Sequence, residues 1–364
     1  MPVPGRPGAR FDSYQLGFDA SWELDLFGRN RRAIEAAQAR TEAAIWSQRD
    51  AEVILTAEVA RAYLNYRALD QRIAIADQLL AVRSEALSFH QVRRRNGLTS
   101  TLDERAAERD IAAAEASHQD LIAQRTAQAH ALAVLLARPP LALTTELEAA
   151  SSLTRTPRDI PVGLPSELLL RRPDLRAAER DLAAATADIG AAADLYPSFS
   201  LTGTVDLVSG SLSKLLSSAS FQPAVTAGLI APLLDGGRRR ATVDLKQSQA
   251  QQALLAYQGA VLAALKDVED ALTRLSADHS RDDQLSAAEA AARDALATIR
   301  VQRNAGLAAE LNVLAAQTVL LNATDALIQA RAATDQDTVA LYKALGGGWS
   351  ARDASAAGIQ EASW

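Results

Sequence analysis

Four histidines at scattered positions are the side chains best suited to metal binding or acid–base catalysis. They are His90, His118, His130 and His279, and none stands at a spacing that metal ligands use. The chain has no cysteine, so it has neither thiolate ligands nor a disulfide framework. The glycine run 346–348 follows a predicted helix instead of a strand, which argues against a phosphate-binding loop. We therefore expect no enzyme, no cofactor and no metal site.

Charge and composition argue against several other classes of protein. A net charge of -6 argues against nucleic acid as a partner, because binding phosphates requires a basic face. Aromatic residues make up only 4% of the chain and the 48% hydrophobic share is mostly Ala, Leu and Val, too few large side chains for two thick cores. The longest wholly apolar run, 131–137, is far shorter than the ~20 residues of a membrane-spanning helix. The first ten residues, MPVPGRPGAR, lack the apolar core of a signal peptide.

The predicted secondary structure, which must position any functional side chain, changes from strand to helix within residues 18–32, FDASWELDLFGRNRR. Up to Leu26 the residues alternate between apolar and polar, as in a strand with two different faces. After Gly28 the pattern is helical, and a helix from 28 to 96 would be roughly 100 Å long. Few soluble domains use a helix of that length.

Two further segments alternate in the same way and are joined by the polar loop SGSLSKLLSSAS into a predicted hairpin. They are residues 198–208 and 221–233, and together with 12–26 they have the ~10-residue alternation of transmembrane barrel strands. An ordinary antiparallel sheet with one face on a soluble core is the alternative. Because no other segment offers a core for that face, we expect it to contact lipid. The predicted lipid-facing side chains are Trp22, Phe199, Leu201, Val205, Phe221, Val225 and Leu229.

Charged and aromatic residues lie close to the ends of these strands. The arginine runs 29–32 and 238–240 directly follow strands, where they would mark the inner membrane–water boundary and the helix start. A solvated helix face is the alternative, and we favour it for the third run, 93–95. We interpret 171–174, RRPD, as a structural helix start. Interfacial aromatics or core packing would each explain Trp22, Tyr196, Phe199 and Phe221.

The chain contains an internal repeat with a constant step of 209 residues, for instance 306 − 97 = 209. Gly28, Val92, Gly97 and Leu98 recur as Gly237, Val301, Gly306 and Leu307. This step predicts a first, incomplete repeat at 11–138, a linker at 139–163, a second repeat at 164–346 and a tail at 347–364. The leading helix of the second repeat, about 164–195, and the strand 198–208 map to positions before Met1. We therefore expect an N-terminal truncation or a mis-started reading frame, with at least ~45 more residues encoded upstream.

The sequence resembles the outer membrane efflux proteins, the TolC-like channels, and within them the NodT-type lipoprotein branch of RND multidrug efflux systems. The matching stretches are SWELDLFGRNRR, LPSELLLRRPDLRAAER, DIGAAADLYPSFSLTG, APLLDGGRRRA and KDVEDAL. The resemblance implies a mainly α fold with a small β part, in which long helices form a periplasmic barrel. It also implies a homotrimer whose chains each give four strands to one twelve-stranded transmembrane barrel.

Function, location and partners follow from the same resemblance. It implies the exit duct of a tripartite efflux pump in the outer membrane of a Gram-negative bacterium, projecting into the periplasm. The partners would be a periplasmic adaptor protein, an inner-membrane RND-type pump and outer membrane lipid. The main alternative is a soluble or peripheral α-helical coiled-coil scaffold with a small sheet.

The resemblance also assigns a role to the turns between the long helices. Gly97-Leu98 and Gly306-Leu307 would form the periplasmic tip, where the adaptor docks and the tunnel narrows, although a plain turn with glycine at positive φ explains them equally well. Asp103 matches an acidic gate position, and its repeat mate is Asn312. A merely solvated Asp103 is the alternative.

Overall fold

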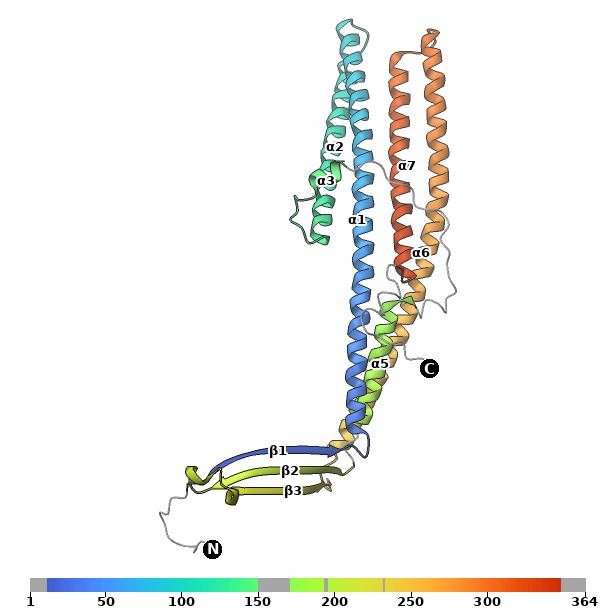
Figure 1. Ribbon diagram of the computed structural model, residues 1–364. Coiled ribbons are helices and arrows are strands. Elements are labelled where there is room, and N and C mark those ends of the chain that lie inside the picture. Colours follow the sequence, from blue (N-terminus) through green and yellow to red (C-terminus); the bar gives the residue numbers. More distant parts are fainter. Residues whose placement is uncertain (1–11, 150–170, 193–195, 232, 348–364) are drawn as a thin grey trace. The chain divides into compact units, whose positions relative to one another are not determined.

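The computed structural model describes residues 12–149, 171–192, 196–231 and 233–347 (Figure 1). Within these ranges the chain forms two compact units. The first combines the residues up to Ile45 with Ala177–Gly259, and the second combines Trp46–Arg176 with the residues from Ala260 onward. Each unit therefore draws on both halves of the sequence.

The first unit contains a three-stranded antiparallel sheet in the order β1-β2-β3. Its strands are β1 (Tyr14–Leu24), β2 (Ser198–Ser209) and β3 (Phe221–Ile230), and the loop between β2 and β3 holds two short 3₁₀ helices. The predicted hairpin is thus present, although β1 and β3 are shorter than the predicted strands at 12–26 and 221–233. The pairing of β1 with β2 was not predicted, because the repeat equates β1 with β3.

The register of the sheet places the apolar residues of all three strands on one face. Leu201 pairs with Trp22 on one side and with Ala227 on the other, and Val205 pairs with Phe18 and Pro223. Directly paired residues of neighbouring strands point to the same side of a sheet. The alternating patterns therefore add up across the sheet instead of cancelling.

Two long helices leave the sheet, and an aspartate caps the start of each. The Asp25 carboxylate accepts the backbone N–H groups of Asn30 and Arg31 at the start of α1 (Arg29–Arg95). Asp235 accepts those of Gly237 and Arg239 at the start of α6 (Arg238–Asn304). These bonds satisfy donors that have no partner within the helix itself. A shorter helix, α5 (Pro173–Ala192), begins in the second unit and belongs to the first from Ala177 onward. It falls within the predicted helix at 164–195, of which residues 164–170 and 193–195 lie outside the described residues.

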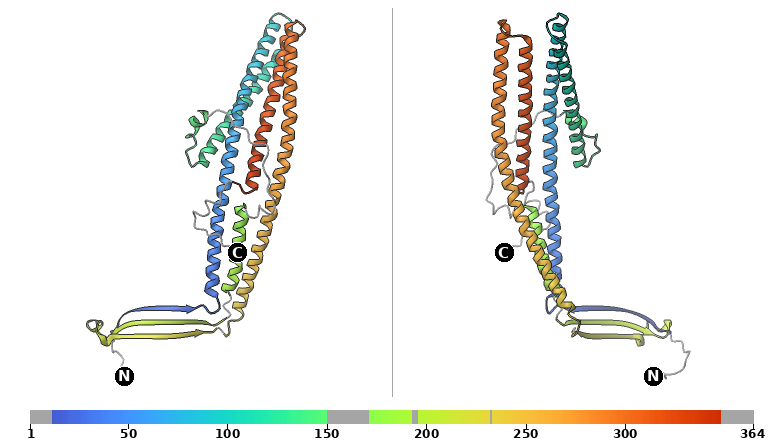
Figure 2. Two further views of the ribbon diagram at one scale, coloured as in Figure 1. Left: turned by 45° about the vertical axis from the view of Figure 1, so that its right-hand side comes forward. Right: turned by 180° about the vertical axis from the view of Figure 1, so that it is seen from behind.

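The second unit is built from two helical hairpins, seen from two sides in Figure 2. The first joins α1 to α2 (Thr101–Leu135), and the second joins α6 to α7 (Glu310–Ala344). The long helices both have 67 residues and the short ones both have 35. Both the first and the last residues of each pair are 209 positions apart, as 238 − 29 and 344 − 135 show. The two hairpins are therefore equal in backbone length.

Small and branched apolar residues hold each hairpin together. Ala133 and Leu341 are fully buried, and the cluster around Leu132 also contains Tyr66 and Leu147. Alanine allows helices to approach closely, which compensates for the small number of large side chains. Leu147 belongs to a short helix, α3 (Thr144–Ala149). This helix lies within the predicted linker at 139–163, where no helix was predicted.

One helix, α7, is long and apolar enough to cross a membrane by length and composition alone, contrary to the expectation from the short apolar runs. Its contacts in the second unit are polar as well as apolar. Asp325 of α7 binds Arg72 of α1 at 2.7 Å, and Arg331 of α7 binds Asp282 of α6 at 3.1 Å. These ion pairs fit a helix that packs against other helices.

Candidate functional site

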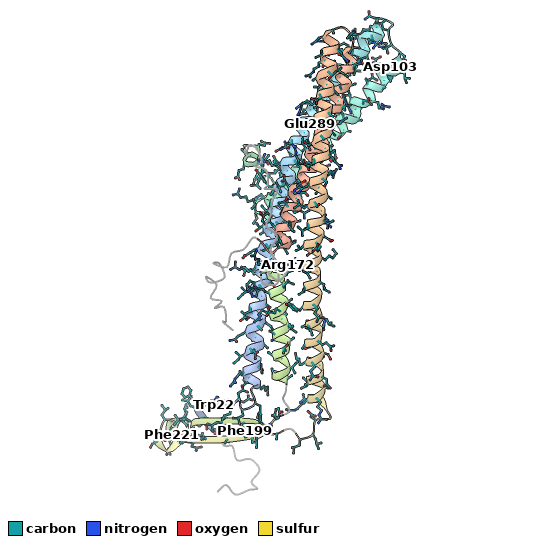
Figure 3. All side chains as sticks on the ribbon, turned by 90° about the vertical axis from the view of Figure 1, so that its right-hand side faces the viewer. Trp22, Asp103, Arg172, Phe199, Phe221 and Glu289 are labelled. Carbon is teal, nitrogen blue, oxygen red and sulfur yellow. The ribbon has the colours of Figure 1, made fainter. Side chains whose placement is uncertain are left out.

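The apolar face of the sheet is open over its whole length. Phe18 is 84% exposed and Val225 is 77% exposed, and Trp22, Phe199 and Phe221 lie on the same face (Figure 3). Exposed apolar surface of this extent marks a contact with lipid or with another protein. All seven predicted lipid-facing residues share this face: Trp22, Phe199, Leu201, Val205, Phe221, Val225 and Leu229.

The opposite face of the sheet is polar and carries its own hydrogen bonds. The Gln15 side chain donates to the Asp206 carboxylate at 3.1 Å, and the Ser21 and Thr202 hydroxyls lie 3.4 Å apart. Gly17 leaves room for Asp206, since a Cβ at this position would lie 2.0 Å from its carboxylate oxygen. A sheet with one apolar and one polar face fits a boundary between hydrocarbon and water.

Aromatic and leucine side chains gather where β1 and β3 end. Phe27 and Tyr196 stack with ring centroids 4.7 Å apart, and Leu26, Leu233 and Leu234, which follow β1 and β3 in the chain, are exposed. Of the four aromatics predicted at strand ends, Trp22, Tyr196 and Phe199 lie at this end of the sheet. Phe221 lies at the opposite end, where it pairs with Leu207.

The two hairpin tips have the same backbone. At the first tip the Gly97 N–H donates to the Arg94 carbonyl and the Leu98 N–H to the Arg93 carbonyl, with Gly97 at φ +70°. At the second tip Gly306 has φ +75° and the corresponding bonds reach Arg303 and Gln302. This is the Schellman arrangement, in which glycine avoids the strain of a left-handed conformation. It leaves two leucines, Leu98 and Leu307, exposed.

Asp103 lies at the start of α2 and takes part in its N-terminal cap. Thr99 Oγ1 and, at 3.4 Å, Ser100 Oγ donate to its carboxylate, while Ser100 Oγ accepts the Leu102 N–H. The hydrogen bond from Thr99 is the main cause that lowers the pKa of Asp103 below its ordinary value of 3.8, with His90 adding a smaller contribution. Asn312 stands at the same point of the second tip, where the capping position is Ala309 and offers no side-chain acceptor.

An ion pair crosses each tip between the two helices. Arg94 pairs with Glu104 at the first tip, and Arg303 lies 2.5 Å from Glu310 at the second. Arg93, Arg94 and Arg95 are all exposed, as the predicted solvated face requires, and Arg94 in addition pairs with Glu104. The internal repeat could have singled out these two arginines, because Arg94 and Arg303 occupy matching positions in it.

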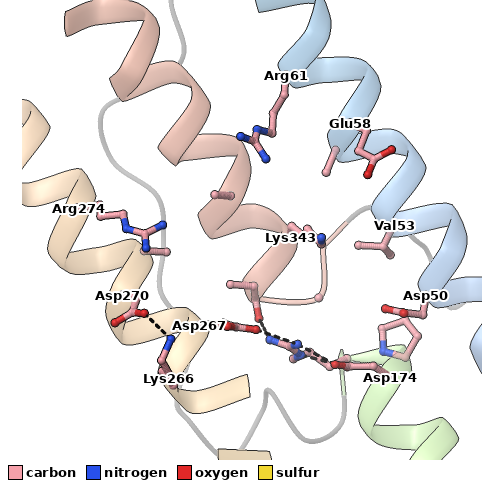
Figure 4. Close-up of a pocket in the computed structure, with 17 residues that line it drawn as sticks. Asp50, Val53, Glu58, Arg61, Asp174, Lys266, Asp267, Asp270, Arg274 and Lys343 are labelled. Carbon is pink, nitrogen blue, oxygen red and sulfur yellow. Dashed lines mark hydrogen bonds and ion pairs between the residues drawn. The ribbon is translucent and has the colours of Figure 1, made fainter. Parts of the chain in front are cut away.

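Arg172 of the RRPD stretch links the first turn of α5 to α6 and α7; its acidic neighbours Asp174 and Asp267 are labelled in Figure 4. Its guanidinium binds Asp174 of α5 in a two-pronged contact at 2.7 and 3.0 Å, lies 3.5 Å from Asp267 of α6, and donates to the Ala344 carbonyl at the end of α7. It lines a cavity of about 320 Å³ that carries acidic and basic side chains from four helices. The structural interpretation of this stretch agrees with these contacts, but the binding of α7 could not be read from a helix-start pattern.

Possible metal ligands are dispersed over the described helices. Within the described residues no group of three or more His, Asp or Glu side chains is placed to hold a metal ion. His118 pairs with Asp77 at 2.8 Å, which gives it a local partner on α1.

The comparisons with known proteins define the class to which this fold and these surfaces belong. The sequence profile described as "Outer membrane efflux protein" matches residues 6–138 and 164–347. The chain therefore belongs to the outer membrane efflux protein family, whose members are channel and transport proteins. The predicted family, the mainly α fold with a small β part, the outer membrane location and the function as an efflux channel are confirmed.

Individual relatives agree with this assignment. The chain is 33% identical over 346 residues to the outer membrane protein OprJ of Pseudomonas aeruginosa, covering 93% of this chain and 71% of OprJ. It is 31% identical over 345 residues to the cation efflux system protein CusC of Escherichia coli K12, covering 92% and 73%. Among solved structures, the outer-membrane channel OprN superposes with a TM-score of 0.86 at 36% identity, covering 95% of this chain and 79% of OprN.

Proposed function

We propose that this chain is the passive exit duct of a tripartite efflux pump and acts as a homotrimer. An inner-membrane RND-type transporter and a periplasmic adaptor protein deliver drugs or other small molecules to it. The energy comes from the transporter, since the duct itself only conducts. The single observation that carries this proposal is the register that gathers the apolar residues of all three strands on one exposed face.

In this proposal the apolar face of the sheet contacts the hydrocarbon of the outer membrane. The three strands have 10 to 12 residues each, which is the length that a tilted strand needs to cross a bilayer. The polar face, with Asp206 and Thr202, then lines a water-filled interior. Strand pairing with neighbouring protomers would satisfy the backbone groups at the sheet edges, as lipid requires.

The helical hairpins extend the duct into the periplasm. Their long helices are rich in alanine and glutamine and have no broad apolar face, as a wall with water on both sides requires. The two tips, with Leu98 and Leu307 exposed, are the surfaces proposed for adaptor docking and for narrowing of the duct. Asp103 and Asn312 are the proposed gate positions, and Gly97 and Gly306 shape the turns that present them.

Adjacent residues of β3 provide a matched test of the lipid-facing assignment. Val225→Lys places a charge on the apolar face beside Gly203, and Thr226→Lys places the same charge on the polar face beside Thr202. A lysine near the bilayer midplane costs about 2–4 kcal/mol on the lipid side. We expect the first variant to lose membrane insertion and the second to insert with altered ion selectivity, as measured by conductance in planar bilayers.

The same experiment separates the proposal from a detergent-free scaffold. Labelling with a lipid-soluble photoreactive probe should modify Phe199, Leu201 and Val225 in the inserted protein. A monodisperse protein without detergent that shows no conductance and no labelling would overturn the proposed duct. Equal insertion of the two lysine variants would overturn the assignment of the two sheet faces.

A further inference from the structure

Arginine side chains gather at the first turns of both long helices, directly after the strands. Arg31 of α1 and Arg238 and Arg240 of α6 are exposed. No ion pair joins these three guanidinium groups to a carboxylate in the part of the chain that the structure describes. Two neighbouring arginines differ, because Arg32 pairs with Glu35 and Arg239 lies 3.4 Å from Asp235. Three cations thus remain available to a ligand outside the chain.

This placement is unfavourable for the helices themselves. The start of a helix carries partial positive charge, so cations there are destabilising and acidic residues are preferred. Neither α1 nor α6 has an acidic residue in its first turn. The capping carboxylates of Asp25 and Asp235 are each engaged by two backbone N–H groups. Arg31 does attract the Asp25 carboxylate and helps to lower its pKa, but the positions of Arg238 and Arg240 have no such explanation in helix stability.

The topology brings both arginine groups to one end of the sheet. β1 and β3 both pair antiparallel with β2, so they run in the same direction and finish at the same end of the sheet, as Figure 1 also shows. Leu24 and Leu229, near these ends, flank Phe199. With one strand between them, the two strand ends are about 10 Å apart. The three arginines can therefore act on a common surface.

The two ends of the sheet differ in charge. At the helix end, Leu233 and Leu234 directly precede the arginine-bearing start of α6 in the sequence, and Leu234 is 98% exposed. At the hairpin end, Leu212 and Leu216 are also exposed, but the loop carries a single cation, Lys214. Apolar side chains followed by cations mark the boundary between hydrocarbon and lipid headgroups.

We propose that Arg31, Arg238 and Arg240 form a basic collar that binds the phosphates of anionic phospholipids in the membrane leaflet from which the helices emerge. The inference rests on the proposed function, because it requires the sheet to lie in a bilayer. The collar continues the apolar face of the sheet at its helix end, and its charge is complementary to phosphate. Guanidinium groups suit this ligand because they bind phosphate oxygens in pairs.

The test uses the full chain in detergent micelles, titrated with phosphatidylglycerol, phosphatidylcholine or inorganic phosphate, with bound molecules counted by native mass spectrometry. The variant Arg31→Gln/Arg238→Gln/Arg240→Gln removes the collar. The matched control, Arg95→Gln/Arg281→Gln/Arg300→Gln, removes three exposed arginines from the same two helices away from the sheet. One basic residue near an anionic membrane surface contributes about fivefold in affinity. We expect the collar variant to lose at least about tenfold in phosphatidylglycerol binding and the control to bind like the wild type.

Each result decides the inference. Equal binding of phosphatidylglycerol by wild type and collar variant, or no preference over phosphatidylcholine, would overturn it. Binding of inorganic phosphate at the same concentrations would assign the collar to free phosphate instead of lipid. If the glutamine variant does not fold, Arg→Lys at the same three positions should keep the lipid preference, and 0.5 M salt should abolish it in the wild type. A chain that does not insert into any bilayer would instead overturn the proposed duct.

Discussion

The two helical hairpins have the same backbone and different side-chain chemistry. Both consist of a 67-residue and a 35-residue helix joined by a Gly-Leu turn in the Schellman arrangement. Matching elements lie 209 residues apart, so each side chain of one hairpin has a mate in the other. The repeat therefore preserves the turn and the helix lengths, which are features of the backbone.

The charged and capping residues are where the hairpins diverge. Leu69 and Gln128 of the first hairpin correspond to Asp278 and Asp337 of the second. The histidines at 90, 118 and 130 correspond to aliphatic residues at 299, 327 and 339. Because the two backbones are equal and their charges are not, a ring built from alternating hairpins would have matching helices but an uneven distribution of charge. Four predictions test this comparison, beginning with the largest expected effect.

The first prediction concerns a pair of mates in the two cores. Leu132 is 3% exposed and Leu341 is 0% exposed, and each packs against the long helix of its own hairpin. Truncation of a buried leucine to alanine costs about 2–5 kcal/mol through lost contacts and the remaining cavity. We expect Leu132→Ala and Leu341→Ala to destabilise by about 3 kcal/mol each, as measured by thermal unfolding of the helical circular dichroism signal. The exposed Leu102→Ala serves as control, and a large difference between the two mates would show that the cores are not equivalent.

The second prediction concerns the residues that end α2 and α7. Ala137 has φ +55° and its mate Gly346 has φ +72°. A Cβ at Gly346 would also lie 3.0 Å from backbone atoms of Arg171 and Arg172. Gly346→Ala should therefore cost more than the ~1–2 kcal/mol of strain that alanine meets at positive φ at an open site. Ala137→Gly should change stability by less than about 1 kcal/mol, because relief of strain is offset by greater freedom of the unfolded chain.

Unfolding midpoints of both variants give the answer for this pair. Gly97→Ala is the control with positive φ and open space around the Cβ, so it isolates the strain. If Gly346→Ala costs no more than Gly97→Ala, the close approach of Arg171 has no energetic weight.

The third prediction concerns the acidic pair of the second hairpin. Burial is the main cause that raises the pKa of Asp337, and the hydrogen-bonded carboxyl of Asp278 raises it further, while Arg274 and Arg61 oppose the shift. An acid with a raised pKa in the folded state binds its proton more tightly there than in the unfolded chain. Stability is therefore lost as pH rises from the ordinary value of 3.8 to the raised folded value.

Replacing Asp337 by the residue of its mate, Asp337→Gln, removes the ionisation. We expect a higher unfolding midpoint at pH 7 and a difference that shrinks as the pH is lowered below 3.8, where Asp337 becomes protonated in both states. Gln128→Asp at the mate position is the converse control. A midpoint difference that does not depend on pH would show that packing, and not charge, distinguishes the two residues.

Much of the fold could be predicted from the sequence because its signals are local or periodic. Alternation gave the two faces of the strands, glycine marked the turns, and the step of 209 residues placed the equivalent helices. Alternation was sufficient to predict the apolar face of the sheet, because the register pairs apolar residues with apolar residues, for instance Leu201 with Trp22.

Contacts between distant segments could not be predicted in the same way. Arg172 binds the end of α7, 172 residues further along the chain, and no local pattern encodes that distance. Arg67 of α1 donates to the Leu147 carbonyl and holds α3, although neither residue stands out in the sequence. The cross-tip pairs of Arg94 and Arg303 were accessible through the repeat, but their acidic partners are not mates. Periodicity therefore predicts where a residue lies within its helix or strand, whereas the residue that it contacts depends on tertiary packing.

The smallest expected effect is at the hairpin tips. Asp103→Asn keeps most of the size of the side chain and removes its charge, which makes the first tip resemble the second at Asn312. The lowered pKa means that the Asp103 carboxylate favours the folded cap at all pH values above about 3.8, and that this contribution is lost as pH falls through the folded pKa. If Asp103 contributes to the proposed gate, Asp103→Asn raises the basal conductance in planar bilayers by a few fold, whereas Asn312→Asp lowers it. If Asp103 only caps α2, its replacement weakens hydrogen-exchange protection in the first turn of α2 and leaves basal conductance and drug resistance unchanged. That result would confine the asymmetry of the two hairpins to stability and remove it from conduction.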